Sequence, residues 1–248
     1  RLGFTIGLAD LVPERETVRK IIDIGVPTAA EQGGNSLAYV AMTSLVAMVG
    51  PVAVAAYGIG NRINTLVFLP AVGIARGTET AVGQNLGAQK PERAKRAVWL
   101  SGLMVVMTFL IMSVLAVVYA ETIVSVFISG ENAQEVIRMG AGYFRIIGPT
   151  YVFMGLFQII NGGFRGAGST RASMVFSFIS QWGVRIPPTF LFITAFGLGA
   201  TGIWLGIAVS HVLAAAVIVV WFFYGNWATS VIDDEDEPAP EGVEPAMD

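Results

Sequence analysis

The chain has 248 residues, of which 54% are hydrophobic and only 13% are charged, and its mean hydropathy is +0.66. A soluble domain carries about 25% charged residues, so the composition predicts an all-α protein that crosses a membrane several times. The net charge of −3 comes from eight acidic residues after Ile232. Without them the chain is mildly basic, so no nucleic-acid partner is expected. The absence of cysteine excludes disulfides, and a single histidine gives no reason to expect a metal site.

Six long apolar runs predict six membrane-spanning helices, because about 20 apolar residues are needed to cross the hydrocarbon core. We expect these helices at residues 21–49, 52–81, 94–120, 137–161, 172–196 and 201–224. An amphipathic connection is expected at 121–136 and a glycine-rich turn at 162–170. Residues 1–20 are predicted to be a cytoplasmic lead-in or inter-lobe linker, and residues 21–227 one six-helix membrane lobe. Residues 228–248 are predicted to be an acidic, disordered cytoplasmic tail.

An even number of spans places both ends of the chain on the same side of the membrane. The loops expected on that side hold most of the basic residues, namely Arg15, Arg19, Lys20, Lys90, Arg93, Lys95, Arg96, Arg165 and Arg171. The loops on the other side hold essentially only Arg138. Because Lys and Arg mark cytoplasmic loops, we predict a multi-pass plasma-membrane protein, surrounded by lipid, with both termini in the cytoplasm.

Polar side chains interrupt the apolar runs at mid-depth, where they are costly unless they face protein or water. Glu31 is the clearest example, because it lies eleven residues beyond Lys20, roughly 16 Å deep in a regular helix. A carboxylate at this depth is protonated, salt-bridged or exposed to a wet cavity. It is therefore either a site for a proton or cation, or half of a structural ion pair with Arg62 or Arg185. The sequence leaves both interpretations open.

We expect the interrupting polar groups to line one cavity for substrate and cation. Its predicted members are Glu31, Gln32, Asn35, Asn61, Arg62, Asn64, Gln158, Gln181 and Arg185. The two arginines could bind an anionic substrate or hold Glu31 ionised, or could form fixed pairs. Arg76 and Glu79, three residues apart, are expected to pair with each other. His211 stands alone in the last span, and we interpret it as a packed core histidine rather than a protonation switch.

A series of short motifs follows the chain in a fixed order. They are AAYGI at 55–59, RI at 62–63, LPAVG at 69–73, VGQNLGA at 82–88, RA at 93–94, FRGAGSTR at 164–171, Trp182 with RIP at 185–187, and GIW at 202–204. This ordered set resembles the multidrug and toxic compound extrusion (MATE) family over nearly all of residues 20–227. Full members of that family have twelve helices in two lobes, and the RIP and GIW motifs resemble the C-terminal lobe.

The resemblance implies a secondary active transporter that exports amphipathic or cationic xenobiotics in exchange for H⁺ or Na⁺, without other cofactors. It also implies a partner, an N-terminal six-helix lobe, with which this lobe would alternate access to the two sides. Since the first residue is Arg rather than Met, we expect further sequence upstream. Sodium-coupled members have a glutamate near the position of Glu31 and an aspartate where this chain has Gly155.

Three alternative functions explain fewer of these residues. A lipid or polysaccharide flippase of the same superfamily would need more basic groups in the cavity than Arg62 and Arg185. An intramembrane enzyme such as a phosphotransferase would need clustered carboxylates for metal and phosphate chemistry, so no enzyme activity is expected. A non-transporting membrane scaffold would leave the deep polar residues without a role.

Overall fold

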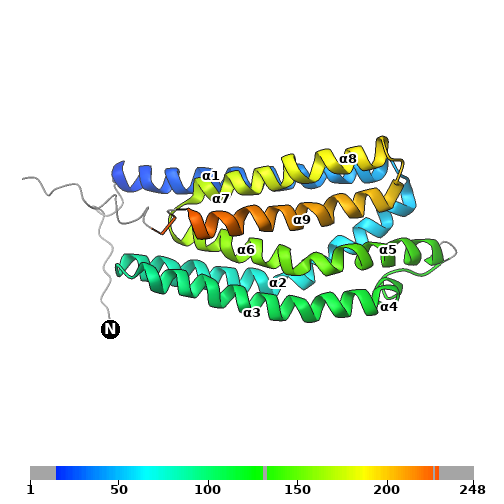
Figure 1. Cartoon of the computed structure of the whole chain (residues 1–248). Coiled ribbons are helices and arrows are strands. Elements are labelled where there is room, and N and C mark those ends of the chain that lie inside the picture. The colour runs from blue at the N-terminus through cyan, green and yellow to red at the C-terminus, as the bar shows by residue number, and fades with distance from the viewer. Residues whose placement is uncertain (1–14, 131–132, 226, 229–248) are drawn as a thin grey trace, which may run out of the picture.

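The computed structural model describes residues 15–130, 133–225 and 227–228, and this part of the chain is helical without any strand. In chain order the elements are α1 (Arg15–Ala47), α2 (Pro51–Gly87), α3 (Pro91–Val118), α4 (Ala120–Ser125), α5 (Ala133–Ile147), η2 (Gly148–Thr150), α6 (Tyr151–Gly166), α7 (Thr170–Phe178), η3 (Ile179–Arg185), α8 (Ile186–Thr194) and α9 (Gly199–Tyr224). The 3₁₀ turn η2 joins α5 to α6, and the π-helix η3 joins α7 to α8. The bundle thus consists of six long rods, α1, α2, α3, α5–α6, α7–α8 and α9 (Figure 1).

Four of these rods are long and apolar enough to cross a membrane, namely α2, α3, α5–α6 and α9. The other two rods lie beside them in the bundle and are also long enough. The 33 residues of α1 extend about 50 Å at 1.5 Å per residue. Glu31 in α1, and Gln181 and Arg185 in η3, lower the hydropathy of these two rods. The chain is therefore an all-α membrane protein, as the composition predicts.

The first helix begins earlier than the apolar pattern predicts. It starts at Arg15 rather than Ile21 and continues without interruption through Pro27. A proline is tolerated in membrane helices because neighbouring groups can satisfy the freed backbone carbonyl. The predicted lead-in is thus partly the first turns of α1, while its residues 1–14 lie outside the described residues. The predicted tail, apart from Ala228, also lies outside them.

The start of α1 and the end of α9 lie at the same end of the bundle (Figure 1). The α2–α3 connection around Lys90 and the α6–α7 connection around Ser169 lie at that end too. The connections α1–α2 and α8–α9 lie at the opposite end. This arrangement is the one that an even number of crossings requires.

Large side chains fill the interior between α2, α3, α5, α6 and α9. Trp204, Tyr143, Phe144 and Phe109 are among the largest fully buried side chains, and Tyr143 meets Trp204 edge to face at 4.9 Å between ring centroids. Outward-facing apolar side chains such as Met107 on α3 are exposed. An apolar outer surface around a buried aromatic core is the arrangement expected of a bundle that has lipid as its solvent.

The glycine-rich segment predicted as a turn is helical in its first half, and this prediction was wrong for residues 162–166. Those residues form the end of α6, and only residues 167–169 make the turn. The glycines let α6 approach its neighbours. A Cβ at Gly166 would lie 2.3 Å from the Glu79 carbonyl oxygen of α2, and one at Gly163 would lie 2.9 Å from Val98 of α3. Small residues serve such close helix contacts in membranes.

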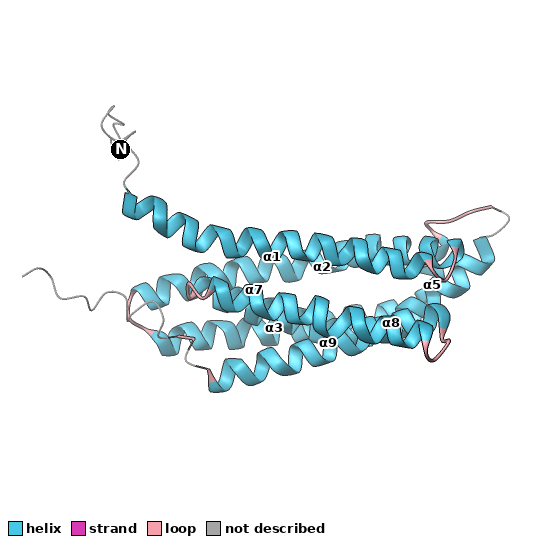
Figure 2. Cartoon of the chain, turned by 90° about the horizontal axis from the view of Figure 1, so that it is seen from above, coloured by secondary structure: helices cyan, strands magenta, loops and turns pink. Residues whose placement is uncertain are grey.

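Helix α1 is less enclosed than the other rods. It packs chiefly against α7, and its first turns stand away from the rest of the bundle (Figure 2). The side chains of Ile21, Ile22 and Ile24 are more than half exposed. The middle of α1 is joined to the bundle by packing of Gly34 against Phe178 and by polar contacts, of which those of Glu31 are the most buried.

Candidate functional site

A cavity of about 760 Å³ opens between α1, α2, α5, α6, the α7–η3 segment and α9. All nine residues expected to line a common cavity do line it: Glu31, Gln32, Asn35, Asn61, Arg62, Asn64, Gln158, Gln181 and Arg185. They come from four different rods, so the tertiary structure brings together what the sequence distributes over 155 positions. Their roles in binding a cation or a substrate remain predictions.

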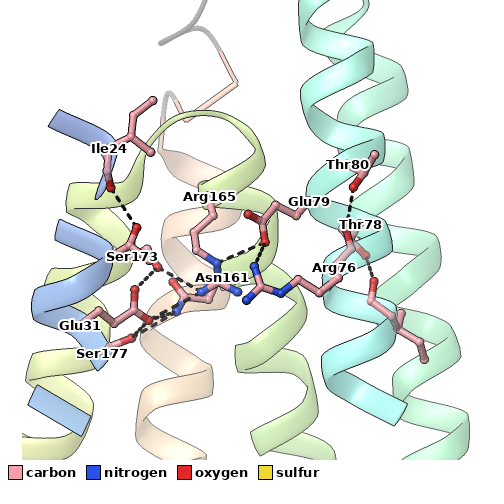
Figure 3. A network of polar contacts seen from close by, with 12 residues as sticks. Ile24, Glu31, Arg76, Thr78, Glu79, Thr80, Asn161, Arg165, Ser173 and Ser177 are labelled. Atoms are coloured by element: carbon pink, nitrogen blue, oxygen red, sulfur yellow. Dashed lines mark hydrogen bonds and ion pairs between the residues drawn. The ribbon is translucent and has the colours of Figure 1, made fainter. Parts of the chain in front are cut away.

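The side chain of Glu31 is buried, with 5% of its surface exposed, and it accepts hydrogen bonds from three side chains (Figure 3). Ser177 donates to Oε1 at 2.7 Å and Ser173 donates to Oε2 at 2.9 Å. The Asn161 amide donates to Oε1 at 3.3 Å. Hydrogen bonds to an ionised group are stronger than neutral ones, so these donors hold a carboxylate in a place where water cannot solvate it fully.

The cation beside Glu31 is Arg165, whose Nη1 lies 3.7 Å from Oε1. The same guanidinium reaches Glu79, with Nε 3.5 Å from its Oε2, and Glu79 also pairs with Arg76 at 3.3 Å. Two carboxylates and two arginines therefore alternate in one chain of charges from α1 through α6 to α2 (Figure 3). The predicted Arg76–Glu79 pair is confirmed, although Glu79 has a second partner.

One of the two interpretations of Glu31 was an ion pair with Arg62 or Arg185, and those two partners were wrong, since the ion-pair partner is Arg165. Arg165 takes this place because α6 remains helical to Gly166, which puts its guanidinium inside the bundle with only 11% of its side chain exposed. The sequence pattern assigned Arg165 to a cytoplasmic loop. Arg185 lies eight residues beyond Ser177 on the same rod, roughly 12 Å farther along the axis at 1.5 Å per residue.

Sequence reasoning missed Ser173, Ser177 and Arg165 as partners of Glu31. A signal was available for the serines, because Ser173, Ser177, Gln181 and Arg185 recur at every fourth position of one helix. Residues four apart share a helix face, so this stripe marks a polar face turned toward the cavity. Gly155, counted as the position of an aspartate in sodium-coupled relatives, packs against Val105 of α3 instead.

A second hydrogen-bond network lies in the half of the cavity that contains Arg185. Asn64 donates to the Tyr143 hydroxyl and accepts from that of Tyr151, which joins α2 to α5 and α6. Gln181 donates to Asn35 at 3.5 Å, joining η3 to α1. Arg185 donates through Nε to the Ser210 hydroxyl at 3.0 Å.

His211 lies next to this network and also lines the cavity. Its side chain is 6% exposed, and Nδ1 is 2.8 Å from the Thr150 hydroxyl. The interpretation of His211 as a satisfied interior histidine agrees with this contact. Gln32, Arg62 and Gln158 also lie on the cavity wall, and Gln32 and Arg62 are exposed at its edge.

Some polar atoms of the wall have no hydrogen-bond partner among the described residues. They are Asn61 Nδ2 and Gln181 Oε1. Asn161 Oδ1, behind the wall beside Glu31, has no partner among the described residues either. Buried polar atoms are nearly always satisfied in native proteins, so these atoms are suited to a polar ligand or water. No group of three metal-ligating side chains of the His, Cys, Asp or Glu type occurs in the described part of the chain.

Membrane transporters commonly bind small solutes in a polar cavity between helices, near a helix interruption such as η3. The family model MatE matches residues 27–191, which is more than half of the chain. The chain therefore belongs to the MatE family.

Relatives and solved structures agree with this assignment. The chain is 27% identical over 218 residues to the probable multidrug resistance protein NorM of Thermotoga maritima, covering 87% of this chain and 46% of the relative. It is 28% identical to the probable multidrug resistance protein YpnP of Bacillus subtilis, covering 87% and 47%. A crystal structure of MATE in complex with MaL6 has the same fold, with a TM-score of 0.85 and 22% identity over 92% of this chain and 50% of that one. The chain spans about half the length of the relatives it matches.

Proposed function

We propose that this chain is the C-terminal lobe of a MATE exporter and that it couples the export of amphipathic compounds to the entry of H⁺ or Na⁺ at Glu31. The observation that supports this proposal is the setting of Glu31, a buried carboxylate that borders the cavity and is held by hydroxyls and an amide. A carboxylate in a membrane interior is costly to keep without function.

A cation on Glu31 would compete with Arg165 for the carboxylate. A proton would neutralise Glu31 directly. Na⁺ could be held by oxygen atoms, which hard cations prefer: those of Glu31, Ser173 and Ser177, and the unpartnered Oδ1 of Asn161. In either case Arg165 keeps Glu79 as a partner. Cation binding at Glu31 would therefore weaken the ion pair between α1 and α6, while the pair between α6 and α2 remains and Arg165 is not left unpaired.

The proposed partner is an N-terminal six-helix lobe that faces this cavity. Rocking of the two lobes about the site between them would expose it to one side and then to the other. Both termini of this lobe would lie in the cytoplasm and the transporter in the cell membrane, because Lys90, Arg93, Lys95 and Arg96 cluster at the end where α1 starts and α9 ends.

A lipid or polysaccharide flippase of the same superfamily is the second candidate. The observation in its favour is that Arg62 and Arg185 border the cavity without a carboxylate within ion-pair distance among the described residues. An anionic head group could therefore pair with the guanidinium groups of Arg62 and Arg185.

Gradient-driven efflux from proteoliposomes that hold this chain together with its N-terminal lobe tests the first proposal. Glu31→Gln is expected to abolish the response of dye efflux to an imposed H⁺ or Na⁺ gradient. Glu92→Gln, which changes an exposed glutamate paired with Lys95, is the matched control and should retain it. An unchanged gradient response in Glu31→Gln would contradict the proposal.

A further inference from the structure

The charged groups around the cavity are unequally distributed. Near Glu31 the charges balance, since Glu31 and Glu79 face Arg165 and Arg76 in one chain of ion pairs. Arg62 and Arg185 also line the cavity, and no acidic side chain pairs with either in the described part of the chain. Of the four arginines that line the cavity, Arg76 and Arg165 are paired with glutamates. The other two, Arg62 and Arg185, have no acidic partner among the described residues, and both lie in the other half of the cavity.

Hydrogen bonds fix the position of Arg185. The wide turns of η3 end at this residue, its carbonyl accepts from Thr189 at 2.7 Å, and its Nε donates to Ser210 at 3.0 Å. A guanidinium has five N–H donors, and those on its two terminal nitrogens have no partner among the described residues. An arginine that is fixed in a membrane interior without a counter-charge is expensive, and a bound anion would remove that cost.

The surroundings of Arg185 suit the rest of an amphipathic molecule. The tyrosines Tyr57 and Tyr143 line the same half of the cavity and can donate to an anion. Apolar side chains, among them Phe68, Met154 and Ile207, also line the cavity. A few polar groups set into an apolar lining are typical of sites for organic ligands.

We propose that Arg185, assisted by Arg62, forms an anion subsite that takes the carboxylate, sulfonate or phosphate group of an amphipathic substrate. The inference rests on the proposed function and deepens it, because it favours anionic and zwitterionic amphiphiles over simple organic cations. The subsite lies roughly 12 Å along the helix axis from Ser177, the nearer of the two serines that hold Glu31, so a substrate anion and a coupling cation bind at separate places.

A pair of dyes that differ only in one carboxylate provides the test. Tetramethylrhodamine is a zwitterion with a free carboxylate, and tetramethylrhodamine methyl ester is a cation. The 248-residue chain is placed in nanodiscs of phosphatidylcholine, and fluorescence anisotropy measures the affinity for each dye, with empty nanodiscs as the blank. Since a hydrogen bond to a charged group contributes about 1.5–3 kcal/mol, the carboxylate dye is expected to bind roughly tenfold more tightly or better.

Substitutions show which arginine causes the tighter binding of the carboxylate dye. In Arg185→Gln the two dyes should bind about equally, and in Arg62→Gln the preference should fall in part. Arg96→Gln removes an exposed arginine of α3 that is not on the cavity wall and should keep the full preference. Arg185→Lys, which retains the charge, replaces Arg185→Gln if the latter does not elute as a single folded species, and should keep a reduced preference.

Nanodiscs with added phosphatidylglycerol identify the natural source of the anion. Competition by this lipid against the carboxylate dye supports the subsite with a lipid head group as occupant, and the absence of competition at a retained preference supports it with a solute. Equal binding of the two dyes by the unchanged chain, or a full preference in Arg185→Gln, overturns the proposal. The measurement uses no ion gradient, so its failure leaves the coupling role of Glu31 standing, and a failure of coupled efflux leaves this binding preference standing.

Discussion

At the scale of single residues, the Glu31–Arg165 pair differs from an isolated buried salt bridge because Arg165 has a second acidic partner. Removing one member of a buried pair commonly costs about 3–5 kcal/mol, since the other charge stays buried alone. Removing Glu31 leaves Arg165 with Glu79, whereas removing Arg165 leaves Glu31 with neutral donors only. The two substitutions should therefore have unequal effects on stability.

We expect Arg165→Met to lower the free energy of unfolding by about 3 kcal/mol, and Glu31→Gln to lower it by about 1 kcal/mol or less. Thermal or denaturant unfolding of the detergent-solubilised chain measures both. The double variant should be more stable than Arg165→Met alone, because the glutamine carries no buried charge. Additive losses in the double variant would show that the two side chains do not interact.

Cation binding at Glu31 can be observed without transport. A change of pH or the addition of NaCl should alter the infrared carboxyl bands of the purified chain, because protonation or Na⁺ contact changes the carbonyl stretch of Glu31. The contribution of Glu31 to the difference spectrum should be missing in Glu31→Gln. It should persist in Glu121→Gln, which changes an exposed glutamate that pairs with Arg145. Identical difference spectra for Glu31→Gln and the unchanged chain would rule out Glu31 as the binding group.

At the scale of elements, the contact between α2 and α6 sets the position of Arg165. Because Gly166 lies against the backbone of Glu79, the crossing of α2 and α6 brings Arg165 next to Glu79, its ion-pair partner. A side chain at Gly166 would separate the helices, and Arg165 would move with α6.

We expect Gly166→Ala to destabilise the chain by about 1–3 kcal/mol, the usual cost of overpacking. Gly73→Ala is the matched control, because Gly73 lies within α2 and a Cβ there meets nothing within 4 Å. It should be neutral, or stabilising by up to about 1 kcal/mol through helix propensity. Unfolding curves of the two variants decide the matter, and equal stability would mean that the α2–α6 contact tolerates a methyl group.

The rods could be predicted from the sequence because apolar length is a local property. The Pro51–Gly87 and Gly199–Tyr224 helices lie within a few residues of their predicted limits, apart from the last turns of α2. The end of α6 could not be predicted in this way. Glycine usually ends a helix, but Gly162 and Gly163 pack tightly on α2 and α3, and this contact overrides their low propensity.

The candidate site, too, could be predicted where it depends on local sequence and could not where it depends on tertiary contacts. Depth within an apolar run was sufficient to select nine residues that share one cavity, since polar groups at mid-membrane depth rarely face lipid. The partner of Glu31 was out of reach, because it depends on which helices are neighbours. Arg165 stands 134 positions after Glu31, and no local pattern relates them.

At the scale of the whole molecule, the position of the two bundle ends predicts the labelling of single cysteines. In this cysteine-free chain, Lys90→Cys lies in the α2–α3 connection and Ser129→Cys before α5 at the other end. We expect an impermeant maleimide added to intact cells to label Ser129→Cys and to label Lys90→Cys only after permeabilisation. Labelling of both from outside would contradict the proposed topology.

The exposure of Gln32 and Arg62 at the edge of the cavity predicts that these 248 residues alone do not transport. Polar groups of an open wall would face lipid, which is costly, so the chain should pair with an N-terminal lobe or with a second copy of itself. Reconstitution at a protein density that gives monomers, with an imposed H⁺ or Na⁺ gradient, is the measurement. Gradient-driven dye uptake by the monomer would show that this lobe is a transporter by itself.

The π-helix η3 has a consequence for the phase of the rod that contains it. In a regular α-helix, Arg185 would be turned by about 80° from Ser177, because each residue advances the helix by 100°. The wider turns of residues 179–185 reduce this angle, so the serines that hold Glu31 and the arginine of the anion subsite share one side of the rod. π-Bulges often occur at functional sites. Here the π-helix turns Arg185 toward the side of the rod that carries Ser177. One rod can therefore place a group that holds the carboxylate of Glu31 and a group that binds anions along the same cavity.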